Sequence, residues 1–400
     1  MSEAVTDRPT RLGLATLVAI VPLYATLAAL DPERPPIPPL LPHAVAVALG
    51  LAALAAYLSV VAAGLRAAQP ATVRFGFLAG GIATLAAAFP GFDPVTGTGL
   101  GVLVLGMGLG GLALSRADAA TVRLCVRTFL WSALLAALVA LAMLVARRPV
   151  AIYAYDNGRA VGTFLNPNEL AAYCLVALGC ALPLAIVTRG RDRLAVAASV
   201  ALAVALGATF SRWGAVSAVC GLAAFAFALR ARRWLVLALA VAVAALALDL
   251  TAGARHHNPR DTEARDVAWR TGWTTFTRFP LLGVGPLAYA KTYEVFRSPD
   301  APGPRAPVAF DPHSLPLSFA ASGGLVALVT LGASVVILQR RIYRDARTAP
   351  QVGRLVALGL ASGLLALYVD CTINTISLFF PLGLQGVGFA LAAAREGVLE

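Results

Sequence analysis

Long apolar runs alternate with short polar stretches along nearly the whole chain of 400 residues. A helix needs about 17 to 25 residues to cross a bilayer, and the runs are long enough for this. They lack the alternation of barrel strands, and lipid cannot satisfy free backbone groups, so helices are expected. The pattern predicts about twelve transmembrane helices, near residues 12–30, 44–63, 75–89, 97–113, 129–146, 170–187, 194–208, 214–229, 235–250, 315–338, 355–369 and 376–394.

One polar stretch is much longer than the others. Residues 251–314 are rich in glycine, proline and charged side chains and are too polar to span a membrane. Within them, residues 261–279 have the spacing of an amphipathic helix with an apolar, Trp-containing face. We therefore expect one all-α polytopic membrane domain over residues 1–400, with a large, partly helical insert at 251–314 between the ninth and tenth helices.

The composition supports a polytopic integral membrane protein. Hydrophobic residues make up 59% and charged residues 13%, against about a quarter charged in soluble domains, and the mean hydropathy is +0.79. The first run follows Arg8 and Arg11, as in a signal peptide, but it is long and further runs follow, so a retained helix is expected. The five cysteines lie in or beside apolar runs without C-x-x-C spacing, which favours buried thiols over disulfides or a zinc site.

The net charge of +12 comes almost entirely from arginine, since Lys291 is the only lysine. The positive-inside rule explains this excess better than nucleic-acid binding does. The arginines of the short connections place both termini in the cytoplasm and the insert outside. Those that break the rule gather in three outer connections, at Arg159, Arg212 and Arg265. This concentration predicts an anionic ligand at the outer face.

Each of these arginines also has an ordinary structural interpretation. Arg159 could be a loop residue ahead of a helix that Asn168 caps, and Arg265 could pair with Asp261 four residues earlier on a helix face. Arg212 is harder to explain structurally, because a short turn between two membrane helices has little reason to hold a guanidinium near hydrocarbon, where it costs about 2.5 to 3.5 kcal/mol at full depth.

His313 stands at the start of the tenth run. It could simply follow a helix cap at Asp311, with Pro312 in the first turn. Imidazole is also the side chain best suited to accept a proton near neutral pH. Two other motifs have simpler explanations: the glycines at 106–111 suit close helix packing better than nucleotide binding, and the adjacent His256 and His257 do not form a metal motif.

Four features, in chain order, resemble the O-antigen ligase and polymerase superfamily. They are G-T-F-L-N-P-N at 162–168, Ser211-Arg212 between two spans, Arg265 and Trp269 ahead of F-P-L-L-G-V-G at 279–285, and P-H-S-L at 312–315 followed by Gly323-Gly324. Many members have Asn after the histidine, where this chain has Ser314, which can still donate a hydrogen bond.

The resemblance implies a GT-C type glycosyltransferase of the bacterial inner membrane. It would transfer a glycan from undecaprenyl diphosphate to a lipid A–core sugar on the periplasmic face, inverting configuration and using no metal or other cofactor. Its partners would be these two substrates and membrane lipids, not nucleic acid. His313 would accept the acceptor's proton. The diphosphate would bind Arg159, Arg212 and Arg265, supported by Asp311, Ser314 and Asn168.

Three alternatives remain open at this stage. The same residues would serve an O-antigen polymerase or a protein O-oligosaccharyltransferase of the same superfamily. A secondary transporter would also have about twelve helices, but it should show matching halves and ionisable residues near mid-membrane. The sequence has no convincing internal repeat, and Asp249 and Asp370 are the carboxylates that a transporter could most readily use.

Overall fold

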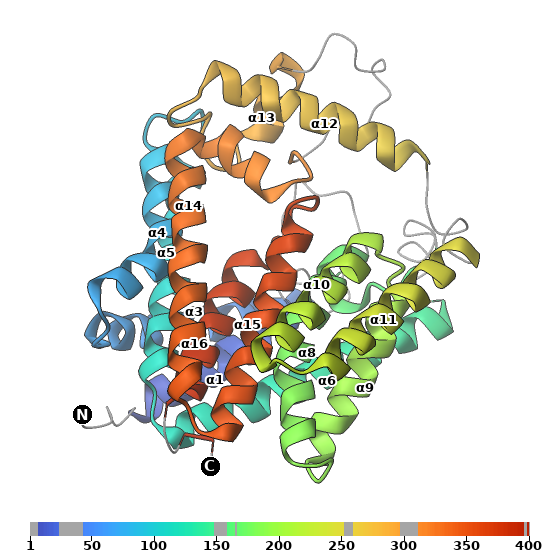
Figure 1. The fold of residues 1–400 in the computed structure, drawn as a ribbon. Helices are drawn as coiled ribbons and strands as arrows, with labels where there is room; N and C mark the ends of the chain where they lie inside the picture. The colour runs from blue at the N-terminus through green and yellow to red at the C-terminus, as the bar shows by residue number, and fades with distance from the viewer. Residues whose placement is uncertain are drawn as a thin grey trace.

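The computed structural model describes residues 7–23, 43–147, 158–164, 166–251, 259–296, 311–395 and 398–399. The regular elements in these ranges are all helices, and they form a bundle with α12 and α13 lying across one end (Figure 1). The α-helices are α1 (Arg8–Ile20), α3 (His43–Arg66), α4 (Ala71–Ala88), α5 (Pro94–Arg116), α6 (Ala119–Ala146), α8 (Pro167–Val187), α9 (Arg193–Ala208), α10 (Arg212–Leu229), α11 (Arg232–Thr251), α12 (Pro259–Arg278), α13 (Tyr289–Phe296), α14 (Leu315–Thr348), α15 (Gln351–Cys371) and α16 (Phe379–Ala393); two short 3₁₀ turns are η1 (Val21–Leu23) and η2 (Gly162–Phe164).

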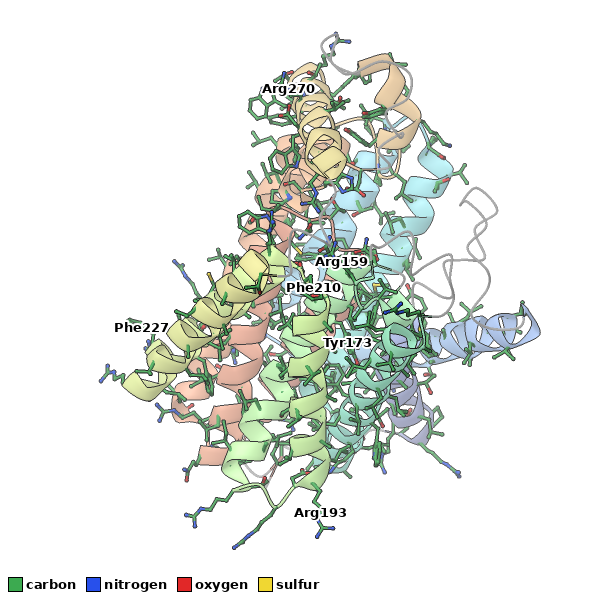
Figure 2. All side chains as sticks on the ribbon, turned by 90° about the vertical axis from the view of Figure 1, so that its right-hand side faces the viewer. Arg159, Tyr173, Arg193, Phe210, Phe227 and Arg270 are labelled. Carbon is green, nitrogen blue, oxygen red and sulfur yellow. The ribbon has the colours of Figure 1, made fainter. Side chains whose placement is uncertain are left out.

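Every predicted apolar run coincides with a helix over its described residues. Eight of these helices are long and apolar enough to cross a membrane, and α9 and α16 are shorter apolar helices. The chain is therefore a multi-pass membrane protein, while the total of about twelve spans remains a prediction. The labelled Arg193 lies at one end of the bundle, and Arg159 and Arg270 lie toward the other (Figure 2).

Small residues allow the central helices to approach each other closely. A Cβ atom at Gly179 of α8 would lie 2.6 Å from the carbonyl oxygen of Gly359 in α15. The glycine-rich stretch of α5 behaves in the same way, because a Cβ at Gly108 would lie 2.2 Å from the Phe77 carbonyl of α4. The prediction that residues 106–111 pack helices together is thus confirmed. All five cysteines are free thiols, and only Cys220 is not fully buried.

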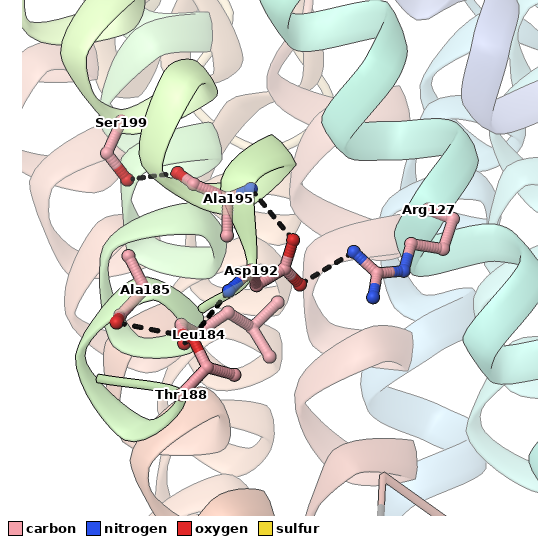
Figure 3. Close-up of polar contacts among 7 residues, drawn as sticks. All are labelled: Arg127, Leu184, Ala185, Thr188, Asp192, Ala195 and Ser199. Atoms are coloured by element: carbon pink, nitrogen blue, oxygen red, sulfur yellow. Dashed lines mark hydrogen bonds and ion pairs between the residues drawn. The ribbon is translucent and has the colours of Figure 1, made fainter. Parts of the chain in front are cut away.

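The turn between α8 and α9 is fixed by Asp192, as Figure 3 shows. Its carboxylate accepts a hydrogen bond from the Ala195 backbone N–H at 3.2 Å, which caps α9, and one from the Arg127 guanidinium of α6 at 2.6 Å. Partial burial alone would raise the pKa of Asp192, but the hydrogen bonds from Arg127 and from the backbone outweigh it, and the pKa lies below its usual range.

Helix α14 is broken at Gly324, whose φ of 62° and ψ of −159° are not helical. The backbone groups freed by the break are paired with the segment 280–285. Val284 donates to the Ala321 carbonyl at 3.0 Å, and Leu325 donates to the Pro280 carbonyl at 2.7 Å. The F-P-L-L-G-V-G segment and the Gly323-Gly324 pair are therefore two halves of one structural joint.

The insert contains α12, which confirms the helix predicted at 261–279, and α13, which was not predicted. It is anchored on the loop between α4 and α5: Phe92 donates its backbone N–H to the Val284 carbonyl at 2.9 Å, and Lys291 of α13 pairs with Asp93. That hydrogen bond from Lys291 lowers the pKa of Asp93. His256 and His257 and the two ends of the insert, at 252–258 and 297–310, lie outside the described residues.

Candidate functional site

One polar cluster joins three predicted site segments. The Arg159 Nε donates to the Thr209 carbonyl at 2.7 Å, and its Nη2 donates to Asn168 Oδ1 at 3.3 Å. The same Asn168 oxygen accepts a hydrogen bond from Ser211 Oγ at 3.0 Å. Asn168 therefore fixes Arg159 against the turn that carries Arg212.

The turn between α9 and α10 is built for this arrangement. Phe210 has a positive φ of 47°, which reverses the chain after α9, and Ser211 then caps α10 by accepting the Gly214 N–H at 3.1 Å. The segment before α8 is held beside this turn, because Ala160 donates its backbone N–H to the Ala208 carbonyl at 2.9 Å.

The prediction that Asn168 caps α8 is wrong. Asn166 is the cap, and its side chain accepts the N–H groups of Asn168 at 2.8 Å and Glu169 at 3.4 Å. Pro167 occupies the first helical position, where proline is favoured because no partner for its missing N–H is needed, so the cap must be the residue before it. This leaves the Asn168 side chain to bind Arg159 and Ser211.

Arg212 is the first residue of α10, and its side chain is exposed. Its guanidinium therefore lies near the positive end of the helix dipole, where an anion is stabilised. Phe210, Ser211 and Arg212 also line the end of an apolar groove of about 460 Å³ between α8, α9, α10, α11 and α15. The guanidinium thus stands where an apolar groove meets the polar end of the bundle.

His313 lies in a tight turn before α14 and has a positive φ of 52°. The Asp311 Oδ1 accepts the His313 backbone N–H at 2.6 Å, while it is 3.8 Å from the imidazole Nδ1, too far for a hydrogen bond. The alternative that Asp311 caps the helix is wrong. Ser314 is the N-cap and Pro316 stands in the first turn, because the left-handed backbone at His313 prevents an earlier start.

Two buried carboxylates lie near this turn and near Arg265. Glu169 is buried and accepts hydrogen bonds from the Ser377 N–H at 2.6 Å and its hydroxyl at 2.7 Å. It lies within electrostatic range of Asp311. Asp370, at the end of α15, interacts electrostatically with both Glu169 and Arg265. Its Oδ2 has no hydrogen-bond partner among the described residues.

The predicted site residues thus gather at one end of the bundle, the end that α12 covers (Figure 1, Figure 2). Arg159, Asn168 and the Ser211-Arg212 turn are joined directly by hydrogen bonds. Arg265 is attracted electrostatically to Asp370, and Glu169, which follows Asn168, lies close enough to Asp311 and Asp370 to be repelled by both. The proposed pairing of Arg265 with Asp261 concerns a side chain outside the described part. In that part, no three His, Cys, Asp or Glu side chains could share a metal ion.

Residues 197–332 match the family model described as O-Antigen ligase. This segment is therefore similar to the O-antigen ligase family. The match confirms the resemblance drawn from the sequence motifs. The matched O-antigen ligase segment runs from α9 past the break in α14 and contains Arg212, Arg265 and His313, while Arg159 and Asn168 precede it. No curated protein matches this chain.

Sequence reasoning underestimated two residues of the candidate site. Glu169 was given no role at the site, and Asp370 was considered only for a transporter. The signal for both was available, since an ionisable side chain at the edge of an apolar run is costly and usually has a partner. Their partners, Ser377 and Arg265, come from distant segments and could not be read from the sequence.

Proposed function

We propose that this protein transfers a glycan from undecaprenyl diphosphate to a sugar of lipid A–core at the outer face of the inner membrane. One observation carries the proposal. Arg212, with Arg159 held beside its turn, stands at the end of a long apolar groove. A polyprenyl diphosphate has the matching shape, because it joins an apolar chain to a headgroup with about two negative charges.

The arginines supply the electrostatics of the reaction. Guanidinium groups stay charged at every physiological pH and can bind phosphate oxygens in a bidentate manner. Arg159 and Arg212 hold the diphosphate, and Arg265 approaches from α12 above the bundle. Negative charge grows on the leaving diphosphate oxygen in the transition state, and fixed cations near that oxygen lower the barrier.

His313 accepts the proton. The oxygen of the acceptor hydroxyl attacks the anomeric carbon while its proton passes to the imidazole. The bond between that carbon and the diphosphate oxygen breaks, and its electron pair leaves with the diphosphate, which inverts the configuration. Asp311 fixes the turn through the His313 N–H. Asn168 orients Arg159, and Ser314 offers its hydroxyl beside the imidazole.

Reconstitution with a polyprenyl-diphosphate glycan and two acceptors tests the proposal. The acceptors are lipid A–core and a second lipid-linked glycan. We expect a lipid A–core product from the wild type and none from His313→Ala. Elongation of the lipid-linked glycan alone would instead assign the protein as a polymerase of the same superfamily. Substrate-driven ion flux in the same vesicles, without any transfer, would contradict both and indicate a transporter.

A matched pair of variants tests the proposed contact between Arg212 and the diphosphate. Arg212→Ala is expected to lower the transfer rate about 100-fold, the usual effect of removing one group that stabilises a transition-state charge. Arg193→Ala removes an exposed arginine at the other end of the bundle and should leave the rate unchanged. Equal rates for both variants, with both proteins folded, would remove the proposed role of Arg212.

A further inference from the structure

A second cavity, of about 610 Å³, opens beside the candidate base. It lies between α12, the start of α14 and the residues that follow α15. Its lining consists of Trp269, Arg270, Trp273, Thr274, Ser314, Leu317, Thr372 and Ile373. We refer to it as the indole groove.

The indole groove differs chemically from the groove at Arg212. The Arg212 groove is lined mostly by aliphatic side chains, glycine and alanine, with two phenylalanines and three serines, and so suits a hydrocarbon chain. The indole groove combines two indole rings, a guanidinium and three hydroxyl groups with only two aliphatic side chains. Aromatic rings that offer an apolar face next to polar groups suit a ligand that is apolar on one side and polar at its edges.

The hydroxyl groups of the indole groove mainly offer acceptor positions. Thr274 Oγ1 already donates to the Arg270 carbonyl at 2.9 Å, and Thr372 Oγ1 donates to the Val369 carbonyl at 2.7 Å. Their remaining lone pairs can accept hydrogen bonds from a ligand. The Ser314 hydroxyl makes no capping bond to α14. The groove therefore fits a ligand with several O–H donors.

The indole groove is also physically joined to His313. Ser314 follows His313 directly and lines the groove. The Trp269 indole N–H points at the His313 carbonyl at 3.5 Å, the long limit for a hydrogen bond. Trp273 stands one helical turn further along α12, with 61% of its surface exposed and its ring 5.6 Å from that of Phe276. A molecule stacked on Trp273 would share its cavity with Ser314, the residue that follows His313.

We propose that the indole groove binds a sugar ring of the acceptor, stacked on Trp273, so that its reactive hydroxyl faces His313. This inference rests on the proposed function, which makes His313 the proton acceptor for that hydroxyl. It adds that donor and acceptor enter by different routes: the donor tail along α8, α10 and α15, and the acceptor sugar between α12 and the outer end of α15.

A binding measurement without catalysis tests the sugar site. The probe is the lipid-free core oligosaccharide, titrated without donor into the full-length protein in nanodiscs. We expect saturable binding to the wild type and to His313→Ala, and about ten-fold weaker binding to Trp273→Ala, the loss of one aromatic contact. Trp131→Ala, which removes an exposed indole from α6, is the matched control and should bind normally. Equal binding by the two tryptophan variants would overturn the proposal.

Steady-state transfer provides the second measurement. Trp273→Ala should raise the KM for the acceptor about ten-fold and leave the KM for the donor within about two-fold. If no transfer is found but the oligosaccharide still binds through Trp273, the sugar site stands and the proposed reaction fails. If transfer proceeds and the acceptor KM is unchanged in Trp273→Ala, the reaction stands and the sugar site fails.

A lipid acyl chain is the competing occupant of the indole groove. Phospholipids brominated in their acyl chains quench nearby indoles, and the quenching due to Trp273 is the difference between the wild type and Trp273→Phe. We expect little quenching at Trp273 and strong quenching at Trp131, an exposed indole of the candidate membrane helix α6. Equal quenching at both positions would place lipid in the groove and overturn the proposal.

Discussion

At the scale of single residues, the Asn168 side chain determines how two of the arginines are presented. Its one amide oxygen accepts hydrogen bonds from both Arg159 and Ser211, so the loop before α8 and the turn before α10 keep one geometry. A carboxylate would accept the same two bonds but would add a negative charge next to Arg159. A substitution at position 168 can therefore change the charge beside Arg159 without changing the hydrogen bonds that hold it.

Asn168→Asp is predicted to fold normally and to bind the donor more weakly. One added negative charge near the bound diphosphate should raise the donor KM about ten-fold. The thermal midpoint in detergent should not fall, because both hydrogen bonds are kept. Asn168→Ala, which loses both bonds, should lower activity and thermal stability together. An unchanged donor KM in Asn168→Asp would mean that Arg159 has only a structural role.

Single residues also show how much of the candidate site could be predicted from the sequence. Arg212 was recognisable because a charged residue beside an apolar run is costly, and Arg159, Arg265 and His313 were recognisable through the motifs of the family resemblance. Their partners were not recognisable. Asn168 was expected to cap α8 because it precedes an apolar run, yet the proline at 167 shifts the cap to Asn166. The pairing of Glu169 with Ser377 spans 208 residues of sequence, and only the tertiary fold creates it.

At the scale of elements, the break in α14 requires glycine on both sides of the joint. Gly283 and Gly324 have φ values of 65° and 62°, and an added Cβ would lie 2.3 Å from the Ser322 carbonyl carbon and 2.2 Å from the Leu281 carbonyl carbon, respectively. The sequence revealed the glycines but not the break, because a Gly-Gly pair in an apolar run also suits close helix packing. The break depends on residues 280–285, which supply its hydrogen bonds.

Gly324→Ala and Gly283→Ala are predicted to destabilise the protein by at least about 1 to 3 kcal/mol, the cost of a side chain in strained backbone. Gly332→Ala is the matched control in the same helix, because a Cβ there meets nothing within 4 Å and alanine favours helix. Thermal unfolding in detergent measures all three variants. The expectation fails if Gly324→Ala is as stable as Gly332→Ala.

We predict that the stability of the hairpin formed by α8 and α9 depends on pH. The pKa of Asp192 is lowered in the folded protein, so its stabilising effect is complete above its unfolded pKa of about 3.9 and disappears as the pH falls through the lower folded value. Asp192→Asn should cost about 0.2 to 1 kcal/mol at pH 7, the value of one exposed ion pair. The difference in thermal midpoint between wild type and variant should shrink below pH 4. A constant difference would contradict the ionic role of Asp192.

At the scale of the whole molecule, the arrangement of the arginines predicts the topology. Arg193 and Arg270 lie toward opposite ends of the bundle (Figure 2), and the charge bias of the short connections assigns the end with Arg193 to the cytoplasm. The apolar runs predicted the helices well because lipid leaves the backbone few alternatives. Which ends come together, and how the insert lies over them, required the structure.

Cysteine labelling checks this orientation. Arg270→Cys and Arg193→Cys are introduced separately in a background lacking Cys220, the one native cysteine that is not fully buried. A membrane-impermeant maleimide should label the Arg270→Cys protein in intact spheroplasts, and the Arg193→Cys protein only after permeabilisation. Labelling of the Arg193→Cys protein in intact spheroplasts would invert the topology and move the proposed site into the cytoplasm.

The joint between α14 and residues 280–285 also constrains how the protein is made. Without that segment, the Leu325 N–H and the Ala321 and Ser322 carbonyls would lose their partners, or the two parts of α14 would fuse into one straight helix. Residues 280–285 precede α14 in the chain, so the ribosome synthesises them first. A segment of the insert therefore supplies the hydrogen bonds that fix where the following helix breaks.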